Sequence, residues 1–281
     1  MAGSGTLVAS ATPWRSFSGA PGPGTAVPVA VRAVAAGQPT RAVWENELGG
    51  ITFEVGADPG RRFVKWAPAG SGIDLGAEAA RLSWAVSVTP VPRLLSRGED
   101  ESGSWIVTAA LPGQSAVTDR WKADPATAVT AIGVGLRELH RAADPAACPF
   151  SWWAEDRLAS VRKQASEGRI DPESWHPAHR PLGIRRALQL VEEIPPVDRL
   201  VVCHGDSCAP NTLLTDDGRW SGHVDLGDLG VADRWADLAV ATWSTQWNYG
   251  PGWDALLLDA YGVRPDPARI RYYRLLWDLG D

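Results

Sequence analysis

The sequence VVCHGDSCAPNTLLTDDGRWSGHVDLGDLGVADRWADL, residues 201–238, predicts a hairpin with polar residues gathered at one end. Its first apolar residues predict a strand that leads to Asp206, and Asn211 follows five positions later. The Asp-Asp-Gly sequence at residues 216–218 is typical of a hairpin turn, and the return strand leads to Asp225. The hairpin would therefore bring Asp206, Asn211 and Asp225 together.

These three side chains predict a particular chemistry. They supply two carboxylates and one amide oxygen, with no cluster of thiolates or imidazoles beside them, and such oxygen donors suit Mg²⁺. Kinase-type phosphoryl transfer uses this set: one Asp meets the acceptor hydroxyl, while an Asn and a second Asp hold metal on the nucleotide phosphates. The alternative is a hairpin with unrelated acidic residues in its turns.

The order of the motifs resembles the catalytic core of the aminoglycoside phosphotransferases, which are antibiotic kinases with a protein-kinase-like fold. The matching motifs are His204-Gly205-Asp206, Pro210-Asn211, Asp225-Leu226-Gly227 and the sequence ADRWADL at residues 232–238. His-Gly-Asp stands where protein kinases have His-Arg-Asp. The residues of these motifs are most similar to those of the branch that acts on the 3′ or 3″ hydroxyl. The resemblance implies an α+β fold of two lobes, an N-terminal antiparallel sheet with a helix and a mainly helical C-terminal lobe.

We expect three segments along the chain. Residues 1–27 are rich in Gly, Ala, Ser and Pro and predict a flexible leader. Residues 28–112 form the expected nucleotide-binding lobe, and residues 113–281 form the catalytic and substrate-binding lobe. Within the first lobe we expect hairpin strands up to residue 67 and a helix over residues 75–87.

The resemblance implies a nucleotide site in the first lobe. Lys65, on a predicted strand, would bind the α and β phosphates, and Glu78, 13 residues later, would pair with it. Phe63 lies on the same strand face and would stack on adenine. A Gly-Gly turn would lie over the phosphates, and backbone groups before the second lobe would meet the adenine edge. The residues implied for these further contacts are Gly49, Gly50, Thr108, Ala110 and Leu213.

The resemblance also implies a substrate site, and here the sequence departs from the family's pattern. Glu173, Asp278 and Asp281 would attract the ammonium groups of an aminoglycoside. His176 and Trp277 stand where relatives commonly have acids, and Asp228 stands where they commonly have Arg. Asp233 and Asp237 are expected to share one face of a helix, as structural residues that tie it to the catalytic loop.

The composition excludes several classes of protein. The chain has 281 residues, a net charge of −6 and a sequence pI near 5.4, which argues against nucleic acid as a partner. No apolar run approaches the roughly 20 residues that span a bilayer, and no secretory signal is visible. The three cysteines, at positions 148, 203 and 208, have no metal-type spacing. We expect a cytoplasmic protein that is a monomer or a weak dimer.

The leading hypothesis is therefore an ATP- or GTP-dependent, Mg²⁺-requiring kinase of aminoglycosides. Transfer to the 3′-hydroxyl of the kanamycin and neomycin class would make it an antibiotic-resistance enzyme. A streptomycin 3″-kinase and a small-metabolite kinase of the same fold are alternatives. A nucleotide-binding pseudokinase is a further one, although Lys65, Asp206, Asn211 and Asp225 are all present.

Overall fold

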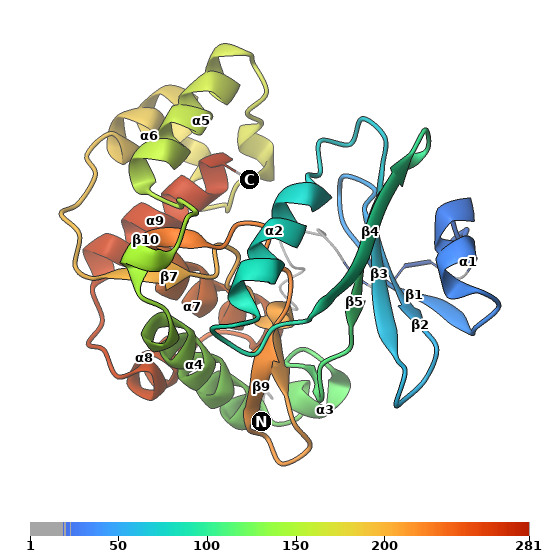
Figure 1. Ribbon diagram of the computed structural model, residues 1–281. Helices are drawn as coiled ribbons and strands as arrows, with labels where there is room; N and C mark the ends of the chain where they lie inside the picture. The colour runs from blue at the N-terminus through green and yellow to red at the C-terminus, as the bar shows by residue number, and fades with distance from the viewer. Residues whose placement is uncertain (1–18, 20, 23, 281) are drawn as a thin grey trace, which may run out of the picture.

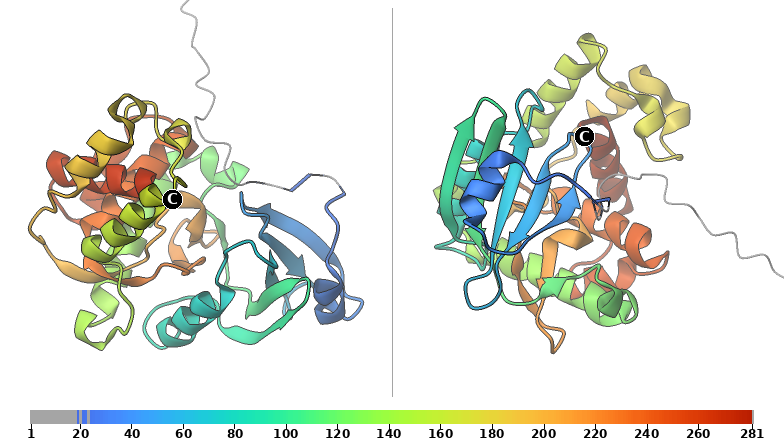
Figure 2. Two further views of the ribbon diagram at one scale, coloured as in Figure 1. Left: turned by 90° about the horizontal axis from the view of Figure 1, so that it is seen from above. Right: turned by 90° about the vertical axis from the view of Figure 1, so that its right-hand side faces the viewer.

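The computed structural model describes residue 19, residues 21–22 and residues 24–280. The described part has a smaller lobe built around a sheet and a larger lobe built mainly from helices (Figure 1). Seen from above, the two lobes lie side by side (Figure 2, left). The predicted two-lobed α+β architecture is confirmed.

The sheet of the N-terminal lobe is antiparallel throughout, and its strands run in the order β1-β2-β3-β5-β4. The strands are β1 (Thr40–Glu45), β2 (Ile51–Val55), β3 (Arg62–Pro68), β4 (Leu94–Asp100) and β5 (Gly103–Ala109). The central position in this order belongs to β3, so that hydrogen-bonded neighbours hold this strand on both sides. Lys65 therefore stands on the best-supported strand of the sheet.

One helix covers each face of this sheet. On the outer face, Val64 of β3 packs in one apolar cluster with Val31 and Ala35 of α1 (Val29–Ala35). On the inner face, Ala67 packs in another cluster with Leu82 of α2 (Leu75–Ala85). Because side chains alternate along a strand, Lys65 shares the face of Ala67. Lys65 is thus directed toward α2 and the second lobe.

The second lobe contains two small antiparallel sheets. One has the order β6-β8-β9 and the other pairs β7 with β10. The predicted hairpin is β8 with β9, in which Thr212 lies opposite His223. The strands are β6 (Gln114–Ser115), β7 (Leu200–Cys203), β8 (Thr212–Leu214), β9 (Trp220–His223) and β10 (Gly230–Asp233).

Helices supply most of the core of this lobe. The α-helices are α3 (Asp119–Lys122), α4 (Pro125–Ala142), α5 (Ala154–Ser166), α6 (Gly183–Val191), α7 (Trp235–Tyr249), α8 (Asp254–Tyr261) and α9 (Pro267–Gly280). Short 3₁₀ turns span Pro145–Ala147, Pro172–Ser174, Arg180–Leu182 and Ala209–Asn211. The first eleven residues of α7 are buried on every side, which is typical of a helix inside a core.

The structure differs from the sequence prediction at the edge of the N-terminal sheet and at the start of α7. Gly19, inside the predicted flexible leader, exchanges two backbone hydrogen bonds with Glu45 at the sheet edge; the other leader residues 1–18, 20 and 23 lie outside the described part. Asp233 ends β10 and does not belong to α7, so it shares no helix face with Asp237.

Among the described residues, none of the helices combines the length and the apolar character that crossing a membrane requires.

Candidate active site

Lys65 contacts one carboxylate in each lobe. Its Nζ donates to Glu78 Oε2 at 2.8 Å and to Asp225 Oδ1 at 2.6 Å. Glu78 is buried in the first turn of α2, which begins where the Asp74 side chain accepts the Ala77 N–H. The predicted Lys65–Glu78 pair is thus present, and the strand, the helix and the catalytic hairpin meet at one ammonium group.

The pKa values of these three groups follow from their burial and their contact. Burial alone would lower the pKa of Lys65, but the charges of Asp225 and Glu78 outweigh it and raise that pKa. Burial likewise opposes ionisation of Asp225, but the ammonium of Lys65 lowers its pKa. For Glu78 burial is the stronger influence, and its pKa is raised. Lys65 is therefore held as a cation, with Asp225 as its main counter-charge.

Asp206 and Asn211 lie on the loop that follows β7. Asn211 Nδ2 donates to the backbone oxygen of Asp206 at 3.0 Å and to Asp206 Oδ2 at 2.9 Å. The Val224 N–H donates to the backbone oxygen of Asn211 at 3.0 Å, which ties this loop to the strand before Asp225. The structure therefore brings Asp206, Asn211 and Asp225 together, as the hairpin predicted.

The residue before Asp206 has to be glycine. Gly205 has a φ of +89°, in the left-handed region that L-residues with a side chain seldom adopt. A Cβ placed there would lie 2.2 Å from the backbone oxygen of Asp228. The close approach of Gly205 to Asp228 sets where the loop turns and hence where Asp206 points.

Asp237 fixes the catalytic loop from beneath. Its Oδ2 accepts the N–H of His204 at 2.6 Å, and its Oδ1 accepts the N–H of Gly205 at 3.0 Å. His140 Nε2 lies 2.9 Å from Oδ2, and its other ring nitrogen lies 2.9 Å from the Tyr261 hydroxyl. Burial would raise the pKa of Asp237, but the hydrogen bond and charge of His140 lower it. The expected structural role of Asp237 is consistent with these contacts.

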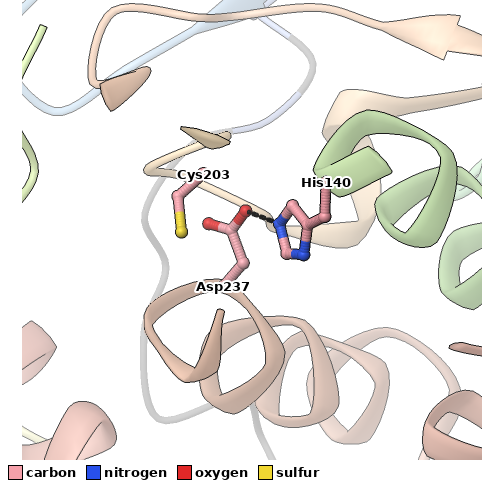
Figure 3. Close-up of side chains that lie close together, drawn as sticks. All are labelled: His140, Cys203 and Asp237. Carbon is pink, nitrogen blue, oxygen red and sulfur yellow. Dashed lines mark hydrogen bonds and ion pairs between the residues drawn. The ribbon is translucent and has the colours of Figure 1, made fainter. Parts of the chain in front are cut away.

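His140 and Asp237 form a buried group of possible metal ligands with Cys203. Figure 3 shows the Asp237 carboxylate between the Cys203 thiol and the His140 ring, with one of its oxygens bonded to that ring. Burial raises the pKa of the Cys203 thiol well above its ordinary value, which disfavours the thiolate that a metal needs. This group is a hydrogen-bonded support for the loop. His140 itself lies in the last turn of α4.

The environment of Asp206 suits a proton acceptor. Burial is the main cause that raises the pKa of its carboxyl group, and the nearby charge of Asp225 adds to the effect. A higher pKa brings a carboxylate closer to the operating pH and makes it a better general base. The same two causes, burial and the charges of Asp206 and Asp225, raise the pKa of Asp228.

The residues present fit a magnesium ion. Asn211 donates through Nδ2 to Asp206, so its Oδ1 is the amide atom that could bind a cation. Asp225 contributes a second, anionic oxygen donor whose pKa is lowered. An amide oxygen and a carboxylate are donors that Mg²⁺ prefers in proteins, alongside phosphate oxygens and water.

The hydrogen bonds inside the Gly49–Gly50 turn differ from those that were expected. The N–H groups of Leu48 and Gly50 donate to Asn46 Oδ1 at 3.1 and 2.7 Å, and the N–H of Gly49 donates to the Asn46 backbone oxygen at 3.1 Å. Gly49 has a φ of +78°. Asn46 was missed by sequence reasoning, although an Asn that opens a tight turn commonly binds the backbone two residues later. It holds the N–H groups that were expected to face phosphate.

The expected adenine contacts lie where β3 begins and β5 ends. Phe63 lies opposite Thr108 in the antiparallel pair, and the Arg61 guanidinium stands 5.7 Å from the centre of the Phe63 ring. The N–H of Ala110 donates to the Arg61 backbone oxygen at 3.2 Å, so in this arrangement it has an internal partner. Leu213 is half-buried on β8 beside Ser115.

Of the expected substrate residues, Glu173 and Asp278 have opposite environments. The Glu173 side chain is 83% exposed and lies 3.8 Å from Arg180. The Asp278 side chain is fully buried: its Oδ2 accepts the His176 N–H at 3.0 Å and lies 2.5 Å from His179 Nδ1. A direct drug contact by Asp278 does not agree with this burial. Asp281 lies outside the described residues.

Sequence reasoning also missed the neighbours of Asp278. His179 contacts its carboxylate, and Trp243 stacks against both His176 and His179. The spacing of Trp243 and Trp247, four residues apart on one helix, was a signal that these two rings would share a face. No pattern in the sequence connects them to residues 176–179.

Comparison with known proteins places this site in a family. The phosphotransferase enzyme family matches residues 48–273. An aminoglycoside 3′-phosphotransferase of Streptomyces fradiae is 33% identical over 250 residues, which is 84% of this chain and 92% of that protein. The streptomycin 3″-kinase of Streptomyces griseus is 32% identical over 280 residues, which is 90% of this chain and 95% of that protein.

Solved structures agree with these relatives. Aminoglycoside phosphotransferase APH(3″)-Id from Streptomyces rimosus, in complex with ADP and streptomycin, is similar with a TM-score of 0.71 and 26% identity, over 89% of this chain and 96% of that chain. The expected kinase-like architecture is confirmed by this likeness. From the matched span and from the identity to its relatives, we conclude that this chain belongs to the phosphotransferase enzyme family.

Proposed function

We propose that this protein is an aminoglycoside O-phosphotransferase that confers antibiotic resistance. It transfers the γ-phosphate of ATP or GTP to the 3′-hydroxyl of a kanamycin- or neomycin-class drug. The observation that carries the proposal is the placement of Lys65, Asp206, Asn211 and Asp225 around one point between the lobes. Such a set has the parts that kinase-type phosphoryl transfer requires.

Each residue has a separate task in the proposed reaction. Lys65 binds the phosphates as a point charge. Asp206 orients the acceptor hydroxyl and accepts its proton, while the hydroxyl oxygen bonds to the γ-phosphorus and the bond to the bridging oxygen breaks. Asn211 and Asp225 would hold Mg²⁺, which neutralises phosphate charge when bound. The products are the phosphorylated drug and the nucleoside diphosphate, and most of the rate comes from positioning and charge stabilisation.

The charge of the protein supports a cationic acceptor. The chain has a net charge of −6, and the exposed carboxylate of Glu173 lies on the loop before α6. Both favour approach of a polycation. We place the enzyme in the cytoplasm, as a monomer or a weak dimer.

A second candidate acceptor is the 3″-hydroxyl of streptomycin. It is favoured by the match to a streptomycin 3″-kinase along 90% of this chain. The side-chain oxygens of Asp206, Asn211 and Asp225 would serve either drug. The difference therefore lies in the loop before α6 and in α9.

A coupled ATPase assay with magnesium separates the candidates. The panel is kanamycin, neomycin, streptomycin and tobramycin, a drug that lacks the 3′-hydroxyl. We expect stimulation by kanamycin and neomycin and none by tobramycin. Stimulation by streptomycin alone would move the acceptor to the 3″ position. Silence across the panel, with ATP still bound, would contradict the proposed function and leave a small-metabolite kinase or a pseudokinase.

A further inference from the structure

Five aromatic side chains gather where α7, α9 and the loop before α6 meet. Two come from α7, one comes from α9 and two are imidazoles of the loop. We call them the ring cluster; its members are His176, His179, Trp243, Trp247 and Trp277.

The three tryptophans of the ring cluster contact one another. The ring centroids of Trp243 and Trp247 are 5.3 Å apart, those of Trp247 and Trp277 are 5.6 Å apart, and those of Trp243 and Trp277 are 6.2 Å apart. Trp243 and Trp277 are buried, whereas Trp247 is half-buried. The cluster is thus a continuous aromatic wall whose solvent-accessible tryptophan is Trp247.

Asp278 connects the loop of His176 and His179 to this wall. Its buried carboxylate accepts the His176 N–H and lies 2.5 Å from His179 Nδ1. The His176 and His179 rings then lie 4.9 and 5.5 Å from the Trp243 ring. One buried carboxylate therefore connects α9 to the loop before α6, through the backbone of His176 and the ring of His179.

The ring cluster is adjacent to the catalytic loop. Cys208, two residues after Asp206, packs against the apolar group formed by Val240, Trp243 and Trp277. The N–H of Ala209 donates to Ser244 Oγ at 2.8 Å, which fixes the loop on the same turn of α7. The loop that carries Asp206 is therefore packed directly against the ring cluster.

We propose that the ring cluster is the acceptor-binding wall of this enzyme and that it binds a protonated amine or guanidinium of the acceptor by cation–π contact. The proposal rests on the proposed function and deepens it. The half-buried Trp247 presents its ring to the acceptor, and the buried Trp243 and Trp277 support it. Asp278 is a positioning residue that acts through His179. Tryptophan is the side chain that binds cations best in this way.

The protein itself already uses one of these rings for a cation. The guanidinium of Arg274 stands 5.4 Å from the centre of the Trp243 ring. Arg274 also donates to Ala239 O at 3.1 Å and to Thr242 Oγ1 at 2.9 Å, which fixes it on α7. The electron-rich ring of Trp243 is therefore shown to accept a cation, and Trp247 offers a ring of the same chemistry nearer to solvent.

The test compares Trp247→Leu with Trp247→Phe and with Trp253→Leu. Trp253 is another half-buried tryptophan of the same lobe, outside the catalytic machinery and the ring cluster. Acceptors are kanamycin and its N-acetylated derivative, which keeps the hydroxyl groups and loses positive charge. Steady-state kinetics give KM and kcat, and calorimetry with ADP and magnesium gives binding without turnover.

We expect Trp247→Leu to raise the KM for kanamycin by roughly 3- to 30-fold, with kcat and the KM for ATP within about twofold. The preference for kanamycin over the acetylated drug should shrink by a similar factor. Trp247→Phe should retain most of the affinity, and Trp253→Leu should behave as wild type. Turnover with an unchanged KM in Trp247→Leu would overturn the inference and leave the proposed function intact. Wild-type binding of kanamycin that depends on Trp247, without turnover, would overturn the function and support the inference.

A second set of variants tests the role of Asp278. We expect Asp278→Asn and His179→Ala each to raise the KM for the acceptor and to leave nucleotide binding unchanged. If Asp278 acts through His179, the double variant should be no worse than His179→Ala alone. Full additivity of the two effects would mean that Asp278 contacts the acceptor directly and would overturn its assignment as a positioning residue.

Discussion

The Nζ of Lys65 lies 2.6 Å from Oδ1 of Asp225, although 160 residues separate them in the chain. This contact brings the central strand of the N-terminal sheet to the end of the catalytic hairpin. Asp225 thus serves the ammonium with one oxygen while its carboxylate belongs to the proposed magnesium site. Substitutions at Asp225 and at Asp206 should separate this binding task from the chemical task of Asp206.

Replacing Asp206 should remove chemistry and keep binding. Asp206→Asn deletes the proposed proton acceptor but leaves Lys65, Asn211 and Asp225 in place. We expect kcat to fall by about 10²- to 10⁴-fold, while ATP binds in the presence of magnesium with nearly wild-type affinity by calorimetry. A variant with wild-type turnover would show that another group accepts the proton.

Replacing Asp225 should do the reverse. Asp225→Asn removes the counter-charge of Lys65 and an anionic oxygen of the proposed metal site. We expect ATP affinity to fall at least about tenfold and to lose its dependence on magnesium, because a charged hydrogen bond contributes roughly 1.5–3 kcal/mol. Titrations of ATP with and without magnesium check this. Magnesium-dependent binding that survives the substitution would remove Asp225 from the metal site.

Turnover should depend on the protonation of Asp206. The base must be ionised, and burial together with the charge of Asp225 raises the pKa of this carboxyl above its ordinary value of 3.8. We therefore expect kcat to rise with pH through an acidic limb above that value and then to level off. The profile is measured at saturating ATP and acceptor. A kcat that stays flat down to the ordinary carboxyl range would contradict the assignment.

Asp237 should be a major determinant of stability. Its buried carboxylate accepts the N–H groups of His204 and Gly205 and contacts His140. Asp237→Asn leaves an amide group facing donors, and we expect the free energy of unfolding to fall by roughly 2–5 kcal/mol. Urea denaturation measures this. Asp216→Asn, at an 87% exposed side chain, is the matched control and should change stability little.

The pH dependence of this contribution has a defined sign. The pKa of Asp237 is lower in the folded protein than its ordinary value. The stabilisation is therefore present above the unfolded-state pKa and is lost as the pH falls through the folded-state pKa. The stability difference between wild type and Asp237→Asn should shrink only at acidic pH. A difference that is constant down to the acid limit of folding would contradict this prediction.

Asn46 should organise the loop over the nucleotide. Asn46→Ala removes the oxygen that accepts the N–H groups of Leu48 and Gly50. Each lost hydrogen bond is worth about 0.5–1.5 kcal/mol, so we expect the KM for ATP to rise by roughly 3- to 30-fold. Asn46→Asp keeps the acceptor oxygen and should retain the turn. If Asn46→Ala instead tightens ATP binding, the side chain competes with phosphate for these N–H groups.

The parts of the site that were predictable from sequence are those held together by local chain geometry. Asn211 and Asp225 flank the β8–β9 hairpin. The turn signal of this hairpin was therefore enough to predict that the two residues lie together. The pairing of Glu78 with Lys65 was implied by the family resemblance, in which a helix follows the strand that carries the lysine. The contact between His140 and Asp237 joins residues 97 positions apart, and no local pattern encodes such a pairing.

The substrate site was less predictable from sequence than the β8–β9 hairpin. An acid near the end of α9 was expected to face a drug, yet Asp278 is buried against His179. Whether a carboxylate faces solvent or a neighbouring imidazole depends on how α9 packs on the loop before α6. That packing is a tertiary property, and the identity of the residue does not carry it.

The apolar packing of α2 has a consequence for how the two lobes stay together. Leu75, Leu82 and Ala85 share one cluster with Leu226 and Leu229 of the second lobe. Separating the lobes would expose this apolar contact surface to water, at a free-energy cost of about 25 cal/mol for each Å². The apolar contact along α2 therefore opposes separation of the two lobes, and it keeps Lys65 within reach of Asp225.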